Sequence, residues 1–448
     1  MTKLPPPQSP VHPTFSEAFF VWLKIGLMSF GGPTGQIALM HDEVVEKRRW
    51  VSDERFLHAL NYCMLLPGPE AQQLSVYIGW LLHRTWGGIV AGALFILPGA
   101  LLLGLISWVY VSFGKVPWID ALFYGLKPAV IAIVCFAVYR IGKKTLRNAM
   151  LWGIAVAAFL AIYYLGIPFP YIIIGAGLVG LAGGCWAPSR FRLDCTHRNT
   201  TDHTPRVIGD TAMADVSLRP TLGGTIRTVI IWSILWCTPV AISWMVLGKE
   251  HVLTAEGIFF SKAAVVTFGG AYSVLPFVGQ QAVEHYGWLA PAQMMDGMAL
   301  AETTPGPLIL VLQFVGFLGA YHAPAPFTPM TAAILGAAMT TWTTFIPSFL
   351  FVLVGAPFIE VLRGQKLLTY ALTAITAAVV GVILNLAVWF AMQVLFPATM
   401  HEPGAVRVDW YAVICSGIAL LGLVRFKWNT LAVIFGCAVL GLAYRTLQ

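Results

Sequence analysis

The 448-residue chain has few charged residues. Asp, Glu, Lys and Arg make up 10% of it, whereas 58% is apolar and the mean hydropathy is +0.76. A soluble domain of this length needs more charge to cover its surface. Apolar runs of about 20 residues, which cross a roughly 30 Å hydrocarbon layer, recur from end to end. The sequence therefore predicts an all-α polytopic membrane protein with about 13 apolar segments, not a β-barrel.

Several kinds of motif are missing as well. The seven cysteines are scattered, with no C-x-x-C pair, no histidine at ligand spacing and no cofactor loop, so we expect no metal, no cofactor and no enzymatic activity. The net charge of +7 does not come from a basic stretch with interleaved aromatic residues, which argues against a nucleic-acid partner. The N-terminus "MTKLPPPQSPVHP" lacks a basic segment before a short apolar core, so we expect no cleaved signal peptide.

One polar stretch interrupts the apolar segments and divides the chain. It is rich in arginine and aspartate, and we interpret it as a cytoplasmic linker. The predicted organisation is a polar N-terminal tail, a first transmembrane repeat, the linker, an unpaired inverting helix and a second transmembrane repeat, at residues 1–14, 15–186, 187–220, 225–248 and 256–448.

The two halves repeat each other. A shift of 238 residues without a gap superposes Lys24 on Lys262, residues 30–32 (F-G-G) on 268–270, Trp50 on Trp288, and residues 67–69 (P-G-P) on 305–307. A match of this length in one register indicates that one fold unit occurs twice. We call these four sites the first and second F-G-G breaks and the first and second P-G-P breaks.

The distribution of basic residues predicts how the two units are oriented. The loops at 41–55 and 140–148 are basic, whereas the matching stretches of the second half contain neither Lys nor Arg. By the positive-inside rule, the repeats have inverted topologies. The N-terminus and linker are then cytoplasmic and the C-terminus is periplasmic.

Each P-G-P break lies within about 30 apolar residues, which as one helix would measure about 45 Å, too long for a single crossing. Proline removes a backbone donor and paired glycines allow sharp turns, so we expect half-helices that meet near the membrane midplane. We favour re-entrant hairpins, with crossing segments as the alternative. Paired interruptions in inverted halves are typical of the central site of a transporter.

The breaks favour an anion as the substrate. The N-termini of half-helices carry partial positive charge, and Lys24 and Lys262 each stand six residues before an F-G-G break. The alternative is that these lysines extend toward the membrane surface, and that polar side chains near the breaks satisfy exposed backbone. The predicted substrate-binding residues are Lys24, Ser29, Gly31, Gly32, Gln36, Pro67, Gly68, Pro69, Gln72, Gln73, Lys262, Thr267, Gly269, Gly270, Thr303, Thr304, Pro305, Gly306 and Pro307.

Two carboxylates near the breaks are candidates for proton coupling. Glu70 follows the first P-G-P break directly, and Glu302 stands three residues before the second. A carboxylate in a medium of low dielectric constant takes up a proton more readily. Glu302 is the stronger candidate, because Glu70 also suits the N-terminal end of a half-helix.

The break segments together resemble a known family. "FGGPTGQIALMHDEVVEKRRWVSDERFLHAL" with "LLPGPEAQQLSVYIGW" in one half, and "FGGAYSVLPFVGQ" with "AETTPGPLILVLQFVGF" in the other, are similar to the chromate ion transporter family of the long bidomain type. The resemblance implies export of the chromate dianion across the bacterial inner membrane, driven by the proton-motive force and giving chromate resistance. It also implies that function concentrates around Lys24, Gln36, Glu70, Gln72 and Gln73.

Other functions fit parts of this pattern. Sulfate, another tetrahedral dianion, would suit the same features, so a sulfate transporter is the main alternative. An uncoupled anion channel and a membrane-bound reductase are further alternatives. The expected partners are a chromate or sulfate-like dianion, protons and membrane lipid, and the sequence leaves monomer and homo-oligomer both open.

Overall fold

The computed structural model describes residues 12–114, 116–186, 207, 221–358, 366–396 and 408–447. These residues form helices and the turns between them, which confirms the all-α prediction. Six helices are long and apolar enough to cross a membrane, and four shorter apolar helices accompany them within the same residues. The predicted linker lies outside the described residues apart from Val207.

The described residues of the first half form seven α-helices. They are α1 (Phe15–Met28), α2 (Gly32–His41), α3 (Asp53–Cys63), α4 (Glu70–Phe113), α5 (Pro117–Thr145), α6 (Ala149–Tyr163) and α7 (Phe169–Trp186), with a short π-helix, η1 (Asp42–Lys47), after α2. Polar side chains cap several N-termini: Thr14 accepts the backbone N–H of Glu17, and Ser52 accepts that of Arg55. Such caps satisfy N–H groups that a helix leaves unpaired, and so fix where it begins.

In the second half, α8 (Leu222–Leu247) precedes the elements that repeat those of the first. These are α9 (Val252–Val266), α10 (Ala271–Gln280), η5 (Gln281–His285), α11 (Pro291–Thr303), η6 (Leu308–Leu310), α12 (Val311–His322), α13 (Pro329–Gly355), η7 (Ala356–Phe358), α15 (Lys366–Leu395), α16 (Trp410–Arg425) and α17 (Thr430–Thr446). Among the described residues, α8 has no counterpart in the first half.

The 44-residue α4 consists of two arms. His83 and Arg84 have non-helical backbone angles, and the arms on either side fold together so closely that a Cβ on Gly79 would stand 2.4 Å from the carbonyl oxygen of Gly87. The arms, residues 70–82 and 85–113, therefore correspond to α12 and α13, which also pack against each other. The sequence predicts this division, because it places separate apolar segments at 55–82 and 86–113.

The chain turns back at the F-G-G breaks. Lys24 Nζ lies 2.9 Å from Glu43 Oε1, whereas 19 residues of continuous helix would separate the two by about 28 Å. In the second half, the rings of Phe259 and Tyr286 have centroids 5.4 Å apart. Both F-G-G breaks are therefore the tips of re-entrant hairpins.

The P-G-P breaks turn in the same way. The rings of Tyr62 and Tyr77, on either side of the first P-G-P break, are 5.6 Å apart. In the second half, Gly297 of α11 faces Phe314 of α12, whose ring atom Cδ1 would stand 2.3 Å from a Cβ on that glycine. The favoured re-entrant arrangement is thus the one adopted at all four breaks.

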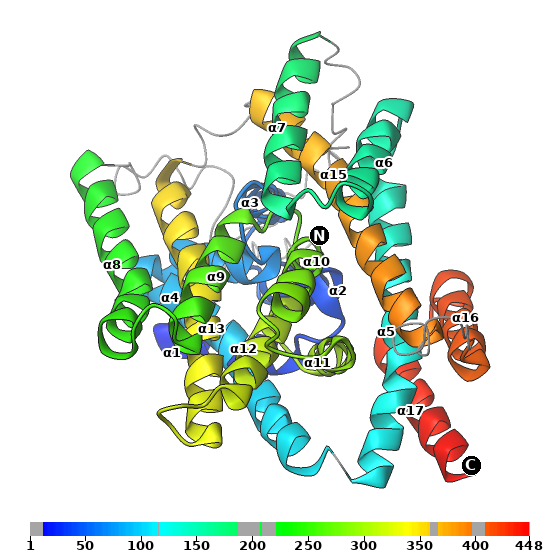
Figure 1. Cartoon of the computed structure of the whole chain (residues 1–448). Helices are drawn as coiled ribbons and strands as arrows, with labels where there is room; N and C mark the ends of the chain where they lie inside the picture. Colours follow the sequence, from blue (N-terminus) through cyan, green and yellow to red (C-terminus); the bar gives the residue numbers. More distant parts are fainter. Residues whose placement is uncertain are drawn as a thin grey trace, which may run out of the picture.

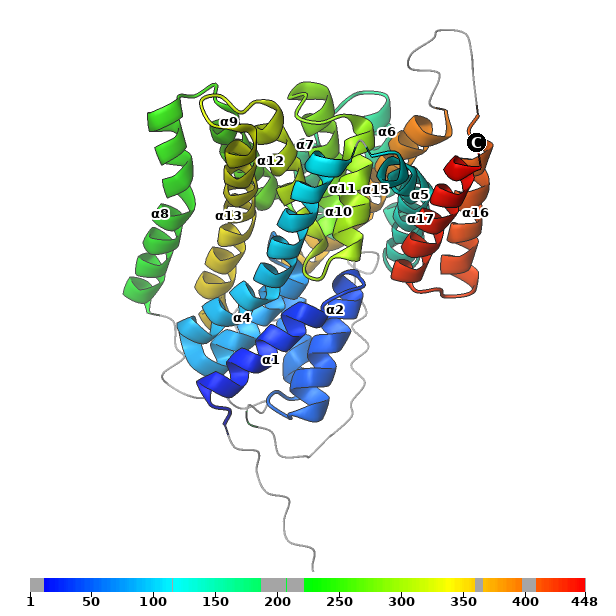
Figure 2. The same cartoon turned by 90° about the horizontal axis from the view of Figure 1, so that it is seen from below.

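Long helices lie at the edges of the molecule. Figure 1 shows α8 at one edge and α5, α16 and α17 at the other. In Figure 2, α1 and α2 lie in the lower half of the bundle and α9 to α12 in the upper half. The helix α15 packs on α5, α6 and α7, so residues from both repeats also meet outside the central hairpins.

Candidate functional site

Each F-G-G break contacts the P-G-P break of the other half. The backbone N–H of Gly306 donates to the carbonyl oxygen of Ser29 at 3.1 Å, and the N–H of Gly68 donates to that of Thr267 at 2.7 Å. In the 238-residue register, Ser29 is equivalent to Thr267 and Gly68 to Gly306. The same hydrogen bond therefore occurs twice, related by the repeat, and it brings the four breaks together at one place.

The glycines of the breaks adopt backbone conformations that other residues rarely reach. Gly31, Gly32, Gly68, Gly269, Gly270 and Gly306 all have φ between +69° and +129°. At Gly68 space is also lacking, because a Cβ would stand 2.5 Å from Ser348 Oγ and 2.7 Å from Gln73 Nε2. Glycine at this position permits both the turn and the close approach of the second half.

A further glycine lets a long helix reach the second P-G-P break. A Cβ on Gly99, in the second arm of α4, would stand 2.1 Å from the carbonyl oxygen of Pro305 and 2.8 Å from Leu310 Cδ1. The sequence motifs do not include Gly99. Its role is to bring α4 against the backbone of the break.

Two glutamine amides donate hydrogen bonds to carbonyl oxygens at the breaks. Gln36 Nε2 donates to the carbonyl oxygens of Ser29, at 3.1 Å, and of Gly306, at 2.6 Å. Gln73 Nε2 donates to the carbonyl oxygen of Pro67 at 2.7 Å. These amides offset part of the negative charge that the carbonyl groups contribute at the breaks.

Gln72 is a buried polar side chain close to the first P-G-P break. It is fully buried, and neither its Nε2 nor its Oε1 has a hydrogen-bond partner among the described residues. Buried polar groups are nearly always satisfied by protein, water or ligand. Gln72 stands two residues beyond Glu70 in the first turn of α4, directly after the first P-G-P break.

The hydroxyl groups of the predicted site bond to the preceding helix turn. Ser29 Oγ donates to Gly26 O, Thr267 Oγ1 to Ala263 O, Thr303 Oγ1 to Leu300 O, and Thr304 Oγ1 to Ala301 O, at 2.6–3.1 Å. Each hydroxyl group thus donates its hydrogen bond to a carbonyl group that would be unpaired at the end of the helix. Ser29 Oγ also accepts the N–H of Gly306 at 2.9 Å.

The two candidate proton carriers approach the same break. Tyr272, just after the second F-G-G break, donates from its hydroxyl to Glu302 Oε1 at 2.5 Å. Glu70 comes from the other half, and its Oε1 lies 3.6 Å from where a Cβ on Gly270 would stand. Carboxylates from both repeats therefore converge on the second F-G-G break.

The lysines lie apart from this convergence. Lys24 is half exposed and bonds to Glu43, which also accepts hydrogen bonds from Lys47 and Arg48. Lys262 is exposed and has no ion pair among the described residues. Gln281 occupies the position equivalent to Glu43, so the second half has no corresponding carboxylate.

The Glu43 cluster remains charged under physiological conditions. Burial acts to raise the pKa of Glu43, but hydrogen bonds from Lys24, Lys47 and Arg48 outweigh it and lower the pKa to about 2. Glu43 belongs to η1, outside the six spanning helices. Lys24, Lys47 and Arg48 share this carboxylate and Asp42, which leaves one excess positive charge beside the first hairpin.

The two F-G-G breaks differ in exposure. Phe30 is 38% exposed, and Gly31 and Thr34 are also exposed. At the equivalent places in the second half, Gly269 is half-buried and Tyr272 is buried. The first hairpin tip is thus open to its surroundings while the second is enclosed by protein.

Besides Glu43, two buried carboxylates escaped the sequence prediction. Glu256, in α9, is fully buried beside Gly319 and Gly336, and Asp296, in α11, accepts a hydrogen bond from Tyr110 Oη at 2.9 Å. Both lie within apolar segments that the sequence marks clearly. A search for acidic residues inside the apolar segments, extended beyond the breaks, would have found both.

Comparison with known proteins places the chain among transporters. A profile of the family described as Chromate transporter matches residues 16–181 and 256–442, one region in each half. The chain is 32% identical to the "Chromate transport protein" of Pseudomonas aeruginosa, over 98% of this chain and 93% of that protein. It is 27% identical to the protein of the same name from Cupriavidus metallidurans, over 92% and 94%. No solved structure matches the chain.

Proposed function

Because this chain belongs to the chromate transporter family, we propose that it exports chromate across the bacterial inner membrane by alternating access, using the proton-motive force. The observation that supports this most strongly is the repeated hydrogen bond between the breaks, Ser29 with Gly306 and Thr267 with Gly68. Broken helices from two inverted repeats that meet inside the membrane are the usual setting of a transporter's substrate site. Export in this direction would give the cell resistance to chromate.

We propose that chromate binds where the four breaks meet. The N-terminal ends of α2, α4, α10 and α12 follow the breaks and present partial positive charge to a dianion. Gln72, which lacks a partner among the described residues, would donate from its amide to an oxyanion oxygen. Lys24 and Lys262 would attract the dianion toward this place from positions nearer the surface, the first with Lys47 and Arg48 beside it.

Proton coupling is assigned to Glu302 and Glu70. Both approach the second F-G-G break, so a proton on either one would change the charge that a bound dianion meets. Binding of one ligand then alters the affinity for the other, which is the thermodynamic requirement for coupling. Tyr272 holds the carboxylate of Glu302 in place.

Inverted repeats suggest what the second conformation is. Here the first F-G-G break is exposed and the second is enclosed; we propose that the halves exchange these environments during transport. Thr34→Cys, at an exposed position, and Ser273→Cys, at a fully buried one, report on the two hairpins.

Each substitution is introduced alone into cysteine-free protein, and its labelling rate is measured in vesicles. A membrane-permeant maleimide should label position 34 faster at rest, and conditions that favour the other conformation, such as reversal of the proton gradient, should slow labelling at 34 and speed it at 273. Labelling rates that move in the same direction at both positions would contradict the exchange.

The experiment that tests the proposed function is chromate uptake by everted vesicles. Vesicles that contain the protein should accumulate chromate when a proton gradient is imposed, and an uncoupler should abolish the accumulation. Sulfate movement that chromate does not inhibit would favour the sulfate alternative. Chromate flux indifferent to the gradient would indicate a channel, and reduction of chromium in proteoliposomes would indicate a reductase.

A further inference from the structure

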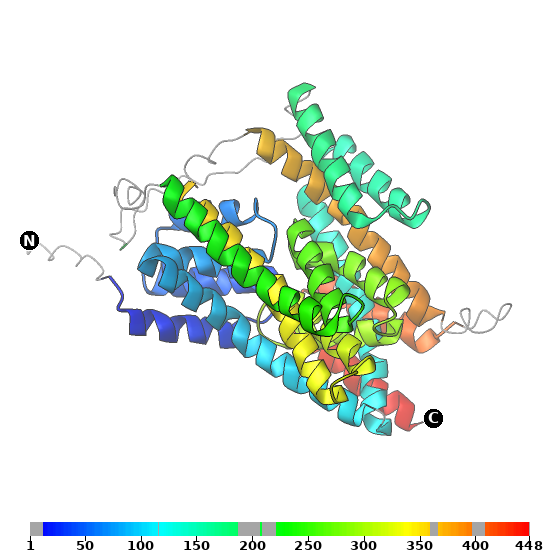
Figure 3. The same cartoon turned by 60° about the vertical axis from the view of Figure 1, so that its left-hand side comes forward.

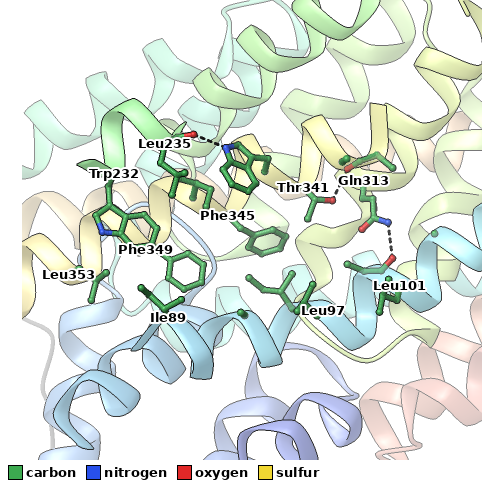
Figure 4. Close-up of a pocket in the computed structure, with 18 of the residues that line it drawn as sticks. Ile89, Leu97, Leu101, Trp232, Leu235, Gln313, Thr341, Phe345, Phe349 and Leu353 are labelled. Atoms are coloured by element: carbon green, nitrogen blue, oxygen red, sulfur yellow. Dashed lines mark hydrogen bonds between the residues drawn. The ribbon is translucent and has the colours of Figure 1, made fainter. Parts of the chain in front are cut away.

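A long groove opens between α4, α8 and α13, away from the breaks. It has a volume of 1510 Å³ and is lined mainly by aliphatic and aromatic side chains. Figure 4 shows Leu97 and Leu101 of α4 facing Phe345 and Phe349 of α13, with Trp232 of α8 beside them. The rings of Trp232 and Phe349 stack with centroids 5.5 Å apart.

The groove exists because α8 is the unpaired helix. Figure 3 shows α8 running alongside α13 at the edge of the molecule. Apart from Trp232 and Ser243, the residues of α8 are at least partly exposed. Its contact with α13 includes a hydrogen bond from Trp342 Nε1 to the carbonyl oxygen of Leu235, at 2.9 Å. An apolar helix attached along one side leaves a lateral opening toward the membrane.

The groove has one basic end. Arg84, at the turn between the arms of α4, and Arg227, in the second turn of α8, both line it there, and both are exposed. Trp86 stands next to Arg84 and is 72% exposed. Tryptophan beside arginine at the end of an apolar stretch is typical of the boundary between hydrocarbon and headgroups.

The length of the groove matches the membrane. Along α4 it extends from Arg84 to Trp108, and 24 residues of helix span about 36 Å, slightly more than a hydrocarbon layer of roughly 30 Å. The basic end lies on the side of the N-terminal segment, because His83 bonds to the carbonyl oxygen of Pro13. That side is the predicted cytoplasmic face, where anionic lipids concentrate.

We propose that this groove binds one anionic phospholipid, with its phosphate between Arg84 and Arg227 and an acyl chain along Leu97, Phe345 and Phe349. Charge complementarity selects an anionic headgroup over a zwitterionic one, and the apolar walls accommodate a chain rather than a polar ligand. The lipid would fill the space between α8 and α4, which both line the groove. It binds away from the chromate site and does not depend on the proposed transport activity.

Lipid retention by the purified protein tests the proposal. Protein extracted in a mild detergent and analysed by mass spectrometry should carry phosphatidylglycerol or another anionic phospholipid in excess over its share of the membrane. Arg227→Gln should lower the retained amount about fivefold, the effect of one basic residue near an anionic surface, and addition of Arg84→Gln should lower it further. Arg425→Gln, an exposed arginine outside the groove, should leave it unchanged.

A second variant blocks the groove without altering its charge. Ala338 lines the groove and is exposed, so Ala338→Trp should fill it and displace the lipid while the protein still folds. Retention of anionic lipid at the wild-type level in both Arg227→Gln and Ala338→Trp would overturn the proposal. A wild-type dimer that Ala338→Trp converts to monomer, with no change in bound lipid, would overturn it too, because a second copy would then occupy the groove.

Discussion

Replacing Glu302 with Gln is expected to uncouple chromate movement from the proton gradient and so to abolish the chromate gradient that the protein sustains. The amide is nearly the same size as the carboxyl group and still accepts the hydrogen bond from Tyr272 that Glu302 Oε1 accepts now. Unlike the carboxylate, the amide cannot take up and release a proton. Chromate should therefore still exchange across the membrane, but only down its own gradient.

A matched control distinguishes coupling from the general loss of a buried carboxylate. Glu256 is also fully buried, but it lies beside Gly319 and Gly336 and away from the breaks, so Glu256→Gln should keep uncoupler-sensitive accumulation. The measurement is chromate accumulation in everted vesicles with and without an uncoupler, normalised to the amount of protein. Wild-type accumulation by Glu302→Gln would remove Glu302 from the coupling mechanism.

Replacing Gly99 with Ala is expected to abolish most transport and to destabilise the protein. The added methyl group would stand 2.1 Å from the carbonyl oxygen of Pro305, a rigid backbone atom, so α4 must move away from the second P-G-P break. Overpacking of this kind costs about 1–3 kcal/mol. Chromate uptake and the thermal unfolding midpoint in detergent should both fall.

The control for Gly99 is a glycine of similar helical setting with open space around it. Gly153, in α6, has no atom within 4 Å of where a Cβ would stand, so Gly153→Ala should leave both measurements near wild type. Uptake is compared well below the unfolding temperature of each variant, so that a rate difference reflects the site. Wild-type uptake by Gly99→Ala would show that close contact between α4 and the break is not needed.

The repeat was predictable from the sequence because it rests on identities in one register. The shift of 238 residues makes Ser29 equivalent to Thr267 and Gly68 to Gly306, and these residues form the repeated hydrogen bonds. That an F-G-G break meets the P-G-P break of the other half was not predictable, because a repeat defines equivalence and not contact. The charge rule favoured the re-entrant route, which places the basic loop 41–55 inside, but crossing segments stayed an alternative because they leave the overall sidedness unchanged.

Side-chain roles near the breaks were less predictable. The amide of a glutamine can donate a hydrogen bond either to an anion or to a carbonyl group. The amide of Gln36 donates to two carbonyl groups. Lysine in an apolar segment suggests a substrate charge, yet Lys24 reaches Glu43, a residue that lies 19 positions away and close only because the hairpin folds back. Glycines such as Gly99 have no sequence signal until the neighbouring backbone is known.

The four breaks meet, each F-G-G break against the P-G-P break of the other half. Cysteine crosslinking in native membranes tests it most directly, using cysteine-free protein with Ser29→Cys and Pro307→Cys in one variant and the equivalent Thr267→Cys and Pro69→Cys in another. We predict that a short bifunctional thiol reagent links both pairs within one chain and that each link blocks chromate uptake. Absence of an intramolecular link in both variants would contradict the account.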